Sequence, residues 1–258
     1  MDPSIASCFL GKPCAVSIPG PVPFCHLRHL RKAEHLYHDG DEFHGLFQVV
    51  RGSFKTLSST SAGIEQVLDF YVPGDFMGMD AISGELYPST AIALQESDVC
   101  AISYSALNEL CALHSDVQNN VHIAMSREIR RKAEITTLLG YTNVEERVAI
   151  FLLDLLDRTA RTGGDTDQVP LPMKRHEIAS FLGMSGETLS RQFTRLQRLG
   201  LIRARINSVQ IMHRTALESS RRQWTEARFS WTALLSSGKA PETRRVPGDS
   251  VPSPTAEV

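Results

Sequence analysis

The clearest pattern of apolar and polar positions lies in residues 175–199 and predicts two short helices joined by a tight turn. The apolar residues at helical spacing are Ile178, Ala179 and Leu182 in the first helix and Leu189, Phe193 and Leu196 in the second. Between the helices, Gly183 can take the left-handed conformation that ends a helix, and Ser185 can cap the next one. The alternating residues 208–212 then predict a β-wing. Together these signals predict a winged helix-turn-helix.

The first half of the chain shows short apolar runs separated by turn signals. The strand-like runs include residues 46–50, 67–71 and 90–94, and the turns contain glycine, as in Pro73-Gly74-Asp75. Glycines at intervals of roughly ten to twenty residues fit the corners of a compact antiparallel roll. We therefore predict an N-terminal antiparallel β-roll.

Helical patterns connect the predicted roll to the helix-turn-helix and continue beyond it. Residues 115–139 predict one long helix, because no Pro or Gly interrupts them before Gly140. Asn143 is placed to cap the helix that follows. The apolar stripe of that helix consists of Val148, Phe151, Leu152, Leu155 and Leu156. Residues 215–235 suggest a further helix containing two Trp, and the Ser-, Pro- and Gly-rich residues after it predict disorder.

Composition adds limits to this picture. The 258 residues are 42% hydrophobic and 22% charged, as expected for one large or two medium globular domains. No apolar run approaches the roughly 18–20 residues of a membrane span, and no secretory signal is visible. The five Cys form no regular disulfide framework. We therefore expect a cytoplasmic protein with reduced thiols and no membrane association.

The outward face of the second short helix has the chemistry of a DNA-binding surface. Glu187 can accept a hydrogen bond from a cytosine amino group, Arg191 can bind guanine with both ends of its guanidinium, and Ser190 can approach a thymine or a phosphate. Residues 168–214 contain eight Lys or Arg against two Glu, although the whole chain has a net charge of only −2. This local excess of positive charge favours double-stranded DNA as the partner.

The run from about residue 40 to residue 212 resembles the superfamily of bacterial regulators built like the cyclic-AMP receptor protein and the fumarate-nitrate-reduction regulator (FNR). Residues 185–191 carry the FNR-type E-x-x-S-R pattern, whereas the cyclic-AMP receptor type has Gly at position 190 and Arg at position 186. The resemblance implies that Glu187, Ser190 and Arg191 contact a half-site similar to TTGAT. Thr194, Arg195 and Lys174 are then expected near phosphates.

The resemblance also implies the fold class and the assembly. The fold is α+β, with a cupin-like β-roll of the cyclic-nucleotide-binding type, a long dimerisation helix and a C-terminal winged helix-turn-helix. The expected segments are an arm (1–23), the roll (24–110), the dimerisation helix (111–140), the DNA-binding domain (141–214) and a C-terminal helix and tail (215–258). A homodimer would bind an inverted repeat similar to TTGAT-N4-ATCAA and work with RNA polymerase.

The expected dimer seam runs along the long helix. Matching the family through residues 125–129 places six residues on it: His122, Met125, Ile129, Lys132, Thr136 and Leu139. Two Lys132 side chains facing each other across a two-fold axis would repel unless Glu128 or Glu134 compensates. The seam is therefore predicted to be only marginally stable.

A cyclic nucleotide is not the expected signal. Family members that bind one have F-x-G-E after the Gly-Asp turn, followed shortly by Arg-Ser or Arg-Thr. Here these segments are Phe76-Met77-Gly78-Met79 and Ser89-Thr90. Without the Arg, the cyclic phosphate would lie in a small cavity with no counter-ion. We therefore predict that cAMP does not bind.

Four cysteines form a candidate [4Fe–4S] site by resemblance to FNR: Cys8, Cys14, Cys25 and Cys100. Cys100 falls where the family's fourth ligand is expected, but the N-terminal spacing departs from the family's tight C-x2-C-x5-C cluster. Cys25 lies so close to Gly40 that it is also a candidate for the first roll strand. The alternatives are a thiol redox switch, or Cys100 and Cys111 as small buried residues. The expected signal is oxygen or redox state.

Other classes of protein remain as alternatives. No nucleophile–base set, phosphate loop or standard metal motif appears, so an enzyme or a small-molecule binding protein with an incidental helix-turn-helix is not favoured. A regulator controlled only by its abundance, without a ligand, also fits the sequence.

Overall fold

The computed structural model describes residues 25–60, 63–141 and 143–218. The chain divides into two compact units, residues 1–221 and 222–258, and every described residue belongs to the first. The predicted arm with Cys8 and Cys14, and nearly all of the predicted C-terminal helix and tail, lie outside the described residues. No helix of the described ranges combines the length and apolar character needed to span a bilayer.

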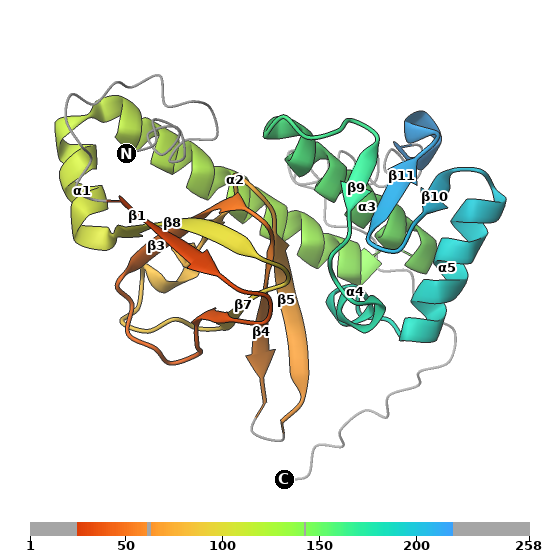
Figure 1. The fold of residues 1–258 in the computed structure, drawn as a ribbon, viewed down its shortest axis with the longest axis horizontal. Helices are drawn as coiled ribbons and strands as arrows, with labels where there is room; N and C mark the ends of the chain where they lie inside the picture. Colours follow the sequence, from red (N-terminus) through yellow and green to blue (C-terminus); the bar gives the residue numbers. More distant parts are fainter. Residues whose placement is uncertain (1–24, 61–62, 142, 219–258) are drawn as a thin grey trace, which may run out of the picture. The chain divides into compact units, whose positions relative to one another are not determined.

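Two four-stranded antiparallel sheets form the predicted roll (Figure 1). The first contains, in order, β1 (Cys25–Leu30), β8 (Ser97–Ser103), β3 (Gly45–Arg51) and β6 (Phe76–Met77). The second contains β2 (His35–Tyr37), β7 (Thr90–Ala93), β4 (Phe54–Ser59) and β5 (Glu65–Tyr71). Each of the three predicted runs lies in a strand (β3, β5 or β7), and Cys25 opens the first strand.

Aromatic side chains fill the interior of the roll. Tyr37 stacks on Tyr87 with ring centroids 4.1 Å apart, and the Tyr87 hydroxyl donates to the Gly45 carbonyl over 2.7 Å. Phe47 and Phe54 are buried in the same core. Burial of such rings is the main stabilisation of a small sheet sandwich.

Helices α1 (Tyr104–Leu113) and α2 (Ser115–Tyr141) follow the last roll strand. Ser103 caps α1 by accepting a hydrogen bond from the Ala106 amide over 3.2 Å. His114 adopts an extended backbone between the two helices, so α2 begins at Ser115 and residues 111–113 belong to α1. α2 matches the uninterrupted helix predicted for residues 115–139.

The C-terminal part is a winged helix-turn-helix (Figure 1). It contains α3 (Val144–Arg161), β9 (Gln168–Pro170), α4 (Arg175–Phe181), α5 (Gly186–Arg198), β10 (Ile202–Ala204) and β11 (Ser208–Ile211). Asn143 caps α3 by accepting from the Glu146 amide over 3.0 Å, and the predicted apolar stripe of α3 is buried. β9 joins the wing as its third strand, in the order β10-β11-β9.

Candidate nucleic-acid interface

The helix-turn-helix is built as its sequence predicts. Gly183 has φ +61°, the left-handed conformation that ends α4. The Ser185 hydroxyl accepts from the Thr188 amide over 3.1 Å and starts α5. The stripe of Leu189, Phe193 and Leu196 is buried under α5. Burial therefore fixes which face of α5 remains in solvent.

The solvent face of α5 brings together the residues predicted to contact bases. Glu187 and Arg191 form an ion pair of 2.5 Å while their side chains remain 74% and 75% exposed. The Ser190 hydroxyl donates to the Gly186 carbonyl over 2.8 Å, and the Thr194 hydroxyl donates to the Ser190 backbone carbonyl over 3.0 Å. A carboxylate, a guanidinium and two hydroxyls thus share one exposed helix face, as major-groove contact requires.

The expected phosphate-contacting residues lie at the edge of this face. Lys174 is exposed at the start of α4, and its amide donates to the Glu177 carboxylate over 2.6 Å. Arg195 is exposed and also pairs with Glu145 of α3 at 2.8 Å, so it helps to hold α5 against α3. The wing adds two exposed arginines, Arg203 and Arg205, which were not among the predicted contact residues. Their position beside the wing turn was visible in the sequence as an R-x-R pattern.

Arg147 of α3 connects the turn of the helix-turn-helix to the end of α2. Its guanidinium donates to the carbonyls of Leu182 and Gly183 over 3.2 and 3.4 Å, and to the carbonyl of Leu139 over 2.9 Å. Charge-assisted bonds of this kind are stronger than neutral ones. The last turn of the long helix and the turn before α5 therefore share one cation.

The roll also contacts the first helix of the motif. Lys55 of β4 pairs with Glu177 of α4 at 2.6 Å, and these side chains are only 13% and 8% exposed. Burial alone would raise the pKa of Glu177, but hydrogen bonds from Lys55 and the Lys174 amide lower it. The Ser180 hydroxyl accepts from the Val67 amide over 3.1 Å. Strands β4 and β5 thus bond directly to α4.

A buried ion cluster joins the roll to α2. Asp69 of β5 is fully buried and accepts hydrogen bonds from Arg131 (2.7 Å) and from Lys132. Burial raises the pKa of Asp69, but Arg131 and Lys132 outweigh it and hold the pKa well below its usual range. Glu128, one of the two residues expected to compensate the charge of Lys132, lies 3.7 Å from it. Asp69 was not foreseen, because the sequence does not show which strand faces α2.

The expected seam residues of α2 differ in exposure. Ile129 is 71% exposed and Leu139 is 36% exposed, although both are large and apolar. Met125 and Lys132 are partly buried. The side chain of Lys132 is directed to the roll of its own chain by Asp69. The seam itself stays a prediction.

The only candidate cysteine ligand whose side chain is described is Cys100, at the centre of β8. It is fully buried and takes part in a disulfide, whereas Cys111 is a free thiol. The register places Cys100 opposite Gln48 and Leu27, so the Cys25 backbone is two positions away on the neighbouring strand. The side-chain oxygen of Gln48 is buried without a hydrogen-bond partner. No three metal-binding side chains converge within the described ranges.

The fold and this interface define a class: winged helix-turn-helix regulators that carry a cyclic-nucleotide-binding type of roll. Family models agree, since residues 27–114 match the cyclic nucleotide-binding domain and residues 146–220 match the Crp-like helix-turn-helix domain. The roll match describes a fold and does not identify a ligand.

Comparison with known proteins narrows the class. The chain is 39% identical over 185 residues to the transcriptional activator FnrA of Stutzerimonas stutzeri and equally to the activator anr of Pseudomonas aeruginosa, covering 72% of this chain and 76% of each relative. The solved structure of FixK2 from Bradyrhizobium japonicum aligns with a TM-score of 0.68 at 26% identity, covering 76% of this chain and 96% of that one. The chain belongs to the CRP/FNR family of transcription regulators, in its FNR-like group. It is a DNA-binding regulator and not an enzyme.

Proposed function

We propose that this protein binds, as a homodimer, an inverted repeat similar to TTGAT-N4-ATCAA. The observation that carries the proposal is the exposed Glu187–Arg191 pair at the start of α5, with Ser190 beside it. On DNA, these groups would exchange their mutual contact for base edges, while Thr194, Arg195 and Lys174 lie towards phosphates. The work takes place in the cytoplasm, together with RNA polymerase.

The homodimer is proposed to form along α2, with Met125, Ile129, Lys132 and Leu139 in the seam. The exposure of two large apolar seam residues, Ile129 (71%) and Leu139 (36%), supports this. Two recognition helices about one DNA turn apart then match the symmetry of an inverted repeat.

A cyclic nucleotide is not the proposed signal. The positions where nucleotide-binding members carry Glu and Arg are occupied by Met79 and Ser89. Tyr37 and Tyr87 fill the interior of the roll between the sheets. Asp80, close enough to Tyr37 to raise the pKa of that buried ring, adds negative charge near the roll core and no counter-ion for a phosphate.

Redox state is the proposed signal, sensed through the thiols of Cys8, Cys14, Cys25 and Cys100. Cys100 is the one member of this donor set whose side chain is described, and it could ligate a [4Fe–4S] cluster only as a thiolate, with its disulfide reduced. Cys100 is buried and disulfide-bonded, and Gln48, opposite it on β3, has a buried side-chain oxygen with no hydrogen-bond partner among the described residues. When bound, such a cluster would supply oxygen-sensitive redox chemistry. Cys100 would hold it against the roll, and Gln48 would border it.

A thiol–disulfide switch is a second candidate, favoured by the disulfide at Cys100. Anaerobic purification followed by an absorbance spectrum and by iron and sulfide analysis separates the two candidates. Stoichiometric iron and sulfide support the cluster. A colourless protein whose free thiol count rises on reduction supports the switch.

The DNA proposal is tested independently, by titrating the anaerobic and the air-exposed protein against the TTGAT repeat and a scrambled duplex. Selective binding of the repeat supports the assignment of the recognition residues, and equal affinity for both duplexes would contradict it. Oxygen-insensitive binding would remove the redox proposal and leave the DNA proposal intact.

A further inference from the structure

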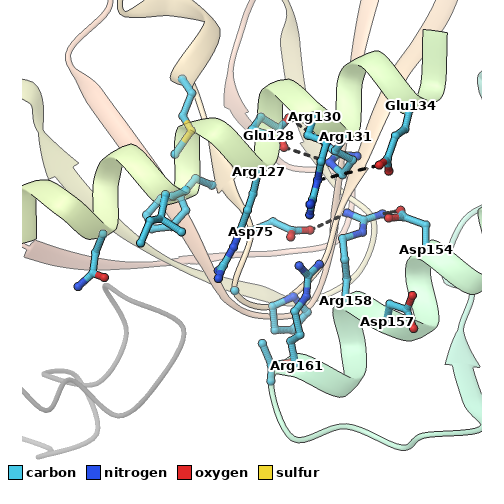
Figure 2. A pocket seen from close by; sticks show the side chains of 18 residues that line it. Asp75, Arg127, Glu128, Arg130, Arg131, Glu134, Asp154, Asp157, Arg158 and Arg161 are labelled. Atoms are coloured by element: carbon cyan, nitrogen blue, oxygen red, sulfur yellow. Dashed lines mark hydrogen bonds and ion pairs between the residues drawn. The ribbon is translucent and has the colours of Figure 1, made fainter. Parts of the chain in front are cut away.

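A cleft of about 850 Å³ lies outside the roll interior and outside the DNA-contacting face. Its walls come from α2, from the roll turn at residues 73–76 and from the C-terminal half of α3. Five arginines and five carboxylates line it, and Figure 2 shows how most of them meet across it. The volume lies within the range of pockets for small organic ligands.

Most charges in the cleft neutralise one another. Arg158 pairs with Asp75 at 2.7 Å and with Asp154 at 2.9 Å. Arg131 pairs with Glu128 at 2.8 Å as well as with Asp69. Two further lining carboxylates also have basic neighbours: Asp157 pairs with Arg214 at 2.7 Å, and Glu134 lies 4.0 Å from Arg130. The acidic side chains are therefore already engaged.

Two cations of the cleft have no such partner. Arg127 of α2 and Arg161 at the end of α3 make no ion pair or side-chain hydrogen bond within the described part of the chain, and both are exposed. Figure 2 shows their side chains pointing into the cleft from different helices. Each guanidinium has five donors in a planar fork, a geometry that matches the oxygens of phosphate.

The rest of the lining supplies an apolar surface. Ile123 of α2 is 39% exposed, and Ala124, Met79 and Pro73 lie along the same cleft. A ligand with an anionic group at one end and an apolar or planar body at the other would match both parts. A simple ion would use only the arginines.

The cleft is also separate from the proposed dimer seam. Its α2 residues Asn120, Ile123, Arg127 and Arg131 recur at intervals of three and four and so share one helix face. Arg127 lies about 200° around the helix from Ile129, the exposed seam residue. The seam residues therefore lie on the opposite face of α2 from the cleft.

We propose that this cleft is a binding site for a small phosphate-bearing organic anion of nucleotide size, held by Arg127 and Arg161. Because its walls belong to the roll, α2 and α3, a ligand there contacts the three parts whose arrangement places α5. By linkage, any effect of the ligand on DNA affinity is matched by an equal effect of DNA on ligand affinity. The site stands whether or not the proposed redox signal does.

The test is calorimetric titration of the full chain, without DNA, with three probes at constant ionic strength: inorganic phosphate, adenosine 5′-diphosphate and adenosine. We expect saturable binding of the two phosphate-bearing probes and none of adenosine. Replacing Arg127→Gln or Arg161→Gln should weaken binding about tenfold each, the value of one charge-assisted contact. Arg31→Gln, an exposed arginine on the roll, is the matched control and should leave the affinity unchanged.

The two phosphate probes distinguish the source of the anion. Tighter binding of the diphosphate nucleotide identifies an organic phosphate, as proposed. Equal affinities would overturn the organic part and identify a site for free phosphate. Absence of saturable binding by the folded wild-type chain, or an unchanged affinity in the Arg127→Gln/Arg161→Gln double variant, would overturn the site altogether.

Discussion

At the scale of single residues, Arg191 carries the sharpest functional prediction. Arg191→Ala should lose roughly 1–3 kcal/mol of discrimination at one base pair of the half-site, because alanine cannot make the two hydrogen bonds that a guanidinium can donate to guanine. The measurement is a titration against the repeat and against single-base variants of it. Arg198→Ala, at the exposed end of the same helix, should weaken all sequences alike. A uniform loss for Arg191→Ala would show that this side chain contacts only phosphate.

Asp69 carries a prediction about stability and pH. Asp69→Asn should destabilise the fold by about 3 kcal/mol near pH 7, because Arg131 loses its buried counter-charge. The folded pKa of Asp69 lies below its unfolded value. Its contribution is therefore complete above about pH 4 and is lost as the pH falls from there towards the folded pKa.

Urea unfolding at fixed protein concentration checks this prediction. The difference in the free energy of unfolding between wild type and Asp69→Asn should be largest at neutral pH and should become smaller in acid. Asp39→Asn, at an exposed loop position, serves as the control and should show almost no difference. A difference that is constant with pH would mean that the carboxylate charge is not what stabilises the cluster.

At the scale of elements, the turn of the helix-turn-helix depends on the left-handed backbone conformation of Gly183, with φ +61°. Gly183→Ala should destabilise the protein by about 1–2 kcal/mol, because a Cβ disfavours the left-handed conformation. No collision contributes, since the nearest atoms to an added Cβ lie 3.6 and 3.7 Å away. Gly186→Ala is the contrast, because this glycine is helical, has open space around it and should gain stability. Thermal and urea unfolding of the three proteins would measure both effects.

Elements with a strong local signal were predictable from the sequence, and those defined by distant partners were not. The α4–α5 turn and the cap at Asn143 follow from neighbouring residues, and both are confirmed. β9 is three residues long and has no strand signal of its own, because only its pairing with β11 makes it a strand. The same holds for Asp69 and Arg147, whose roles depend on which surfaces pack together. The exposure of Glu187, Ser190 and Arg191 was predictable because the spacing of apolar residues along a helix determines which face is polar, and their contact with DNA stays a prediction.

At the scale of the whole molecule, Arg158 is the buried cation that joins the DNA-binding part to the roll. It lies in α3, is 3% exposed, and donates to the Phe70 carbonyl over 2.9 Å as well as pairing with Asp75. Asp154 and Asp75 raise the pKa of Arg158 in spite of its burial. Burial raises the pKa of Asp75 although Arg158 lowers it. Without Arg158, the charged form of this buried carboxylate would therefore be strongly disfavoured.

Arg158→Leu should therefore cost about 3 kcal/mol and separate the unfolding of the two parts. Calorimetry should show one transition for the wild type and two for the variant. Arg161→Leu, one turn along α3 and without an ion-pair partner in the described ranges, should keep the single transition. A single, merely shifted transition in Arg158→Leu would show that other contacts suffice to couple the parts.

The shared cation at Arg147 has a mechanical consequence. The Arg147 guanidinium bonds both the last turn of α2 and the turn before α5. A rotation of α2 about its own axis would therefore be passed through Arg147 to the start of the recognition helix. In a symmetric pair, both recognition helices would swing together, and their separation along the DNA would change by the sum of the two movements. DNA binding would then be controlled by the distance between the two recognition helices, and Arg147 would be the residue that sets it.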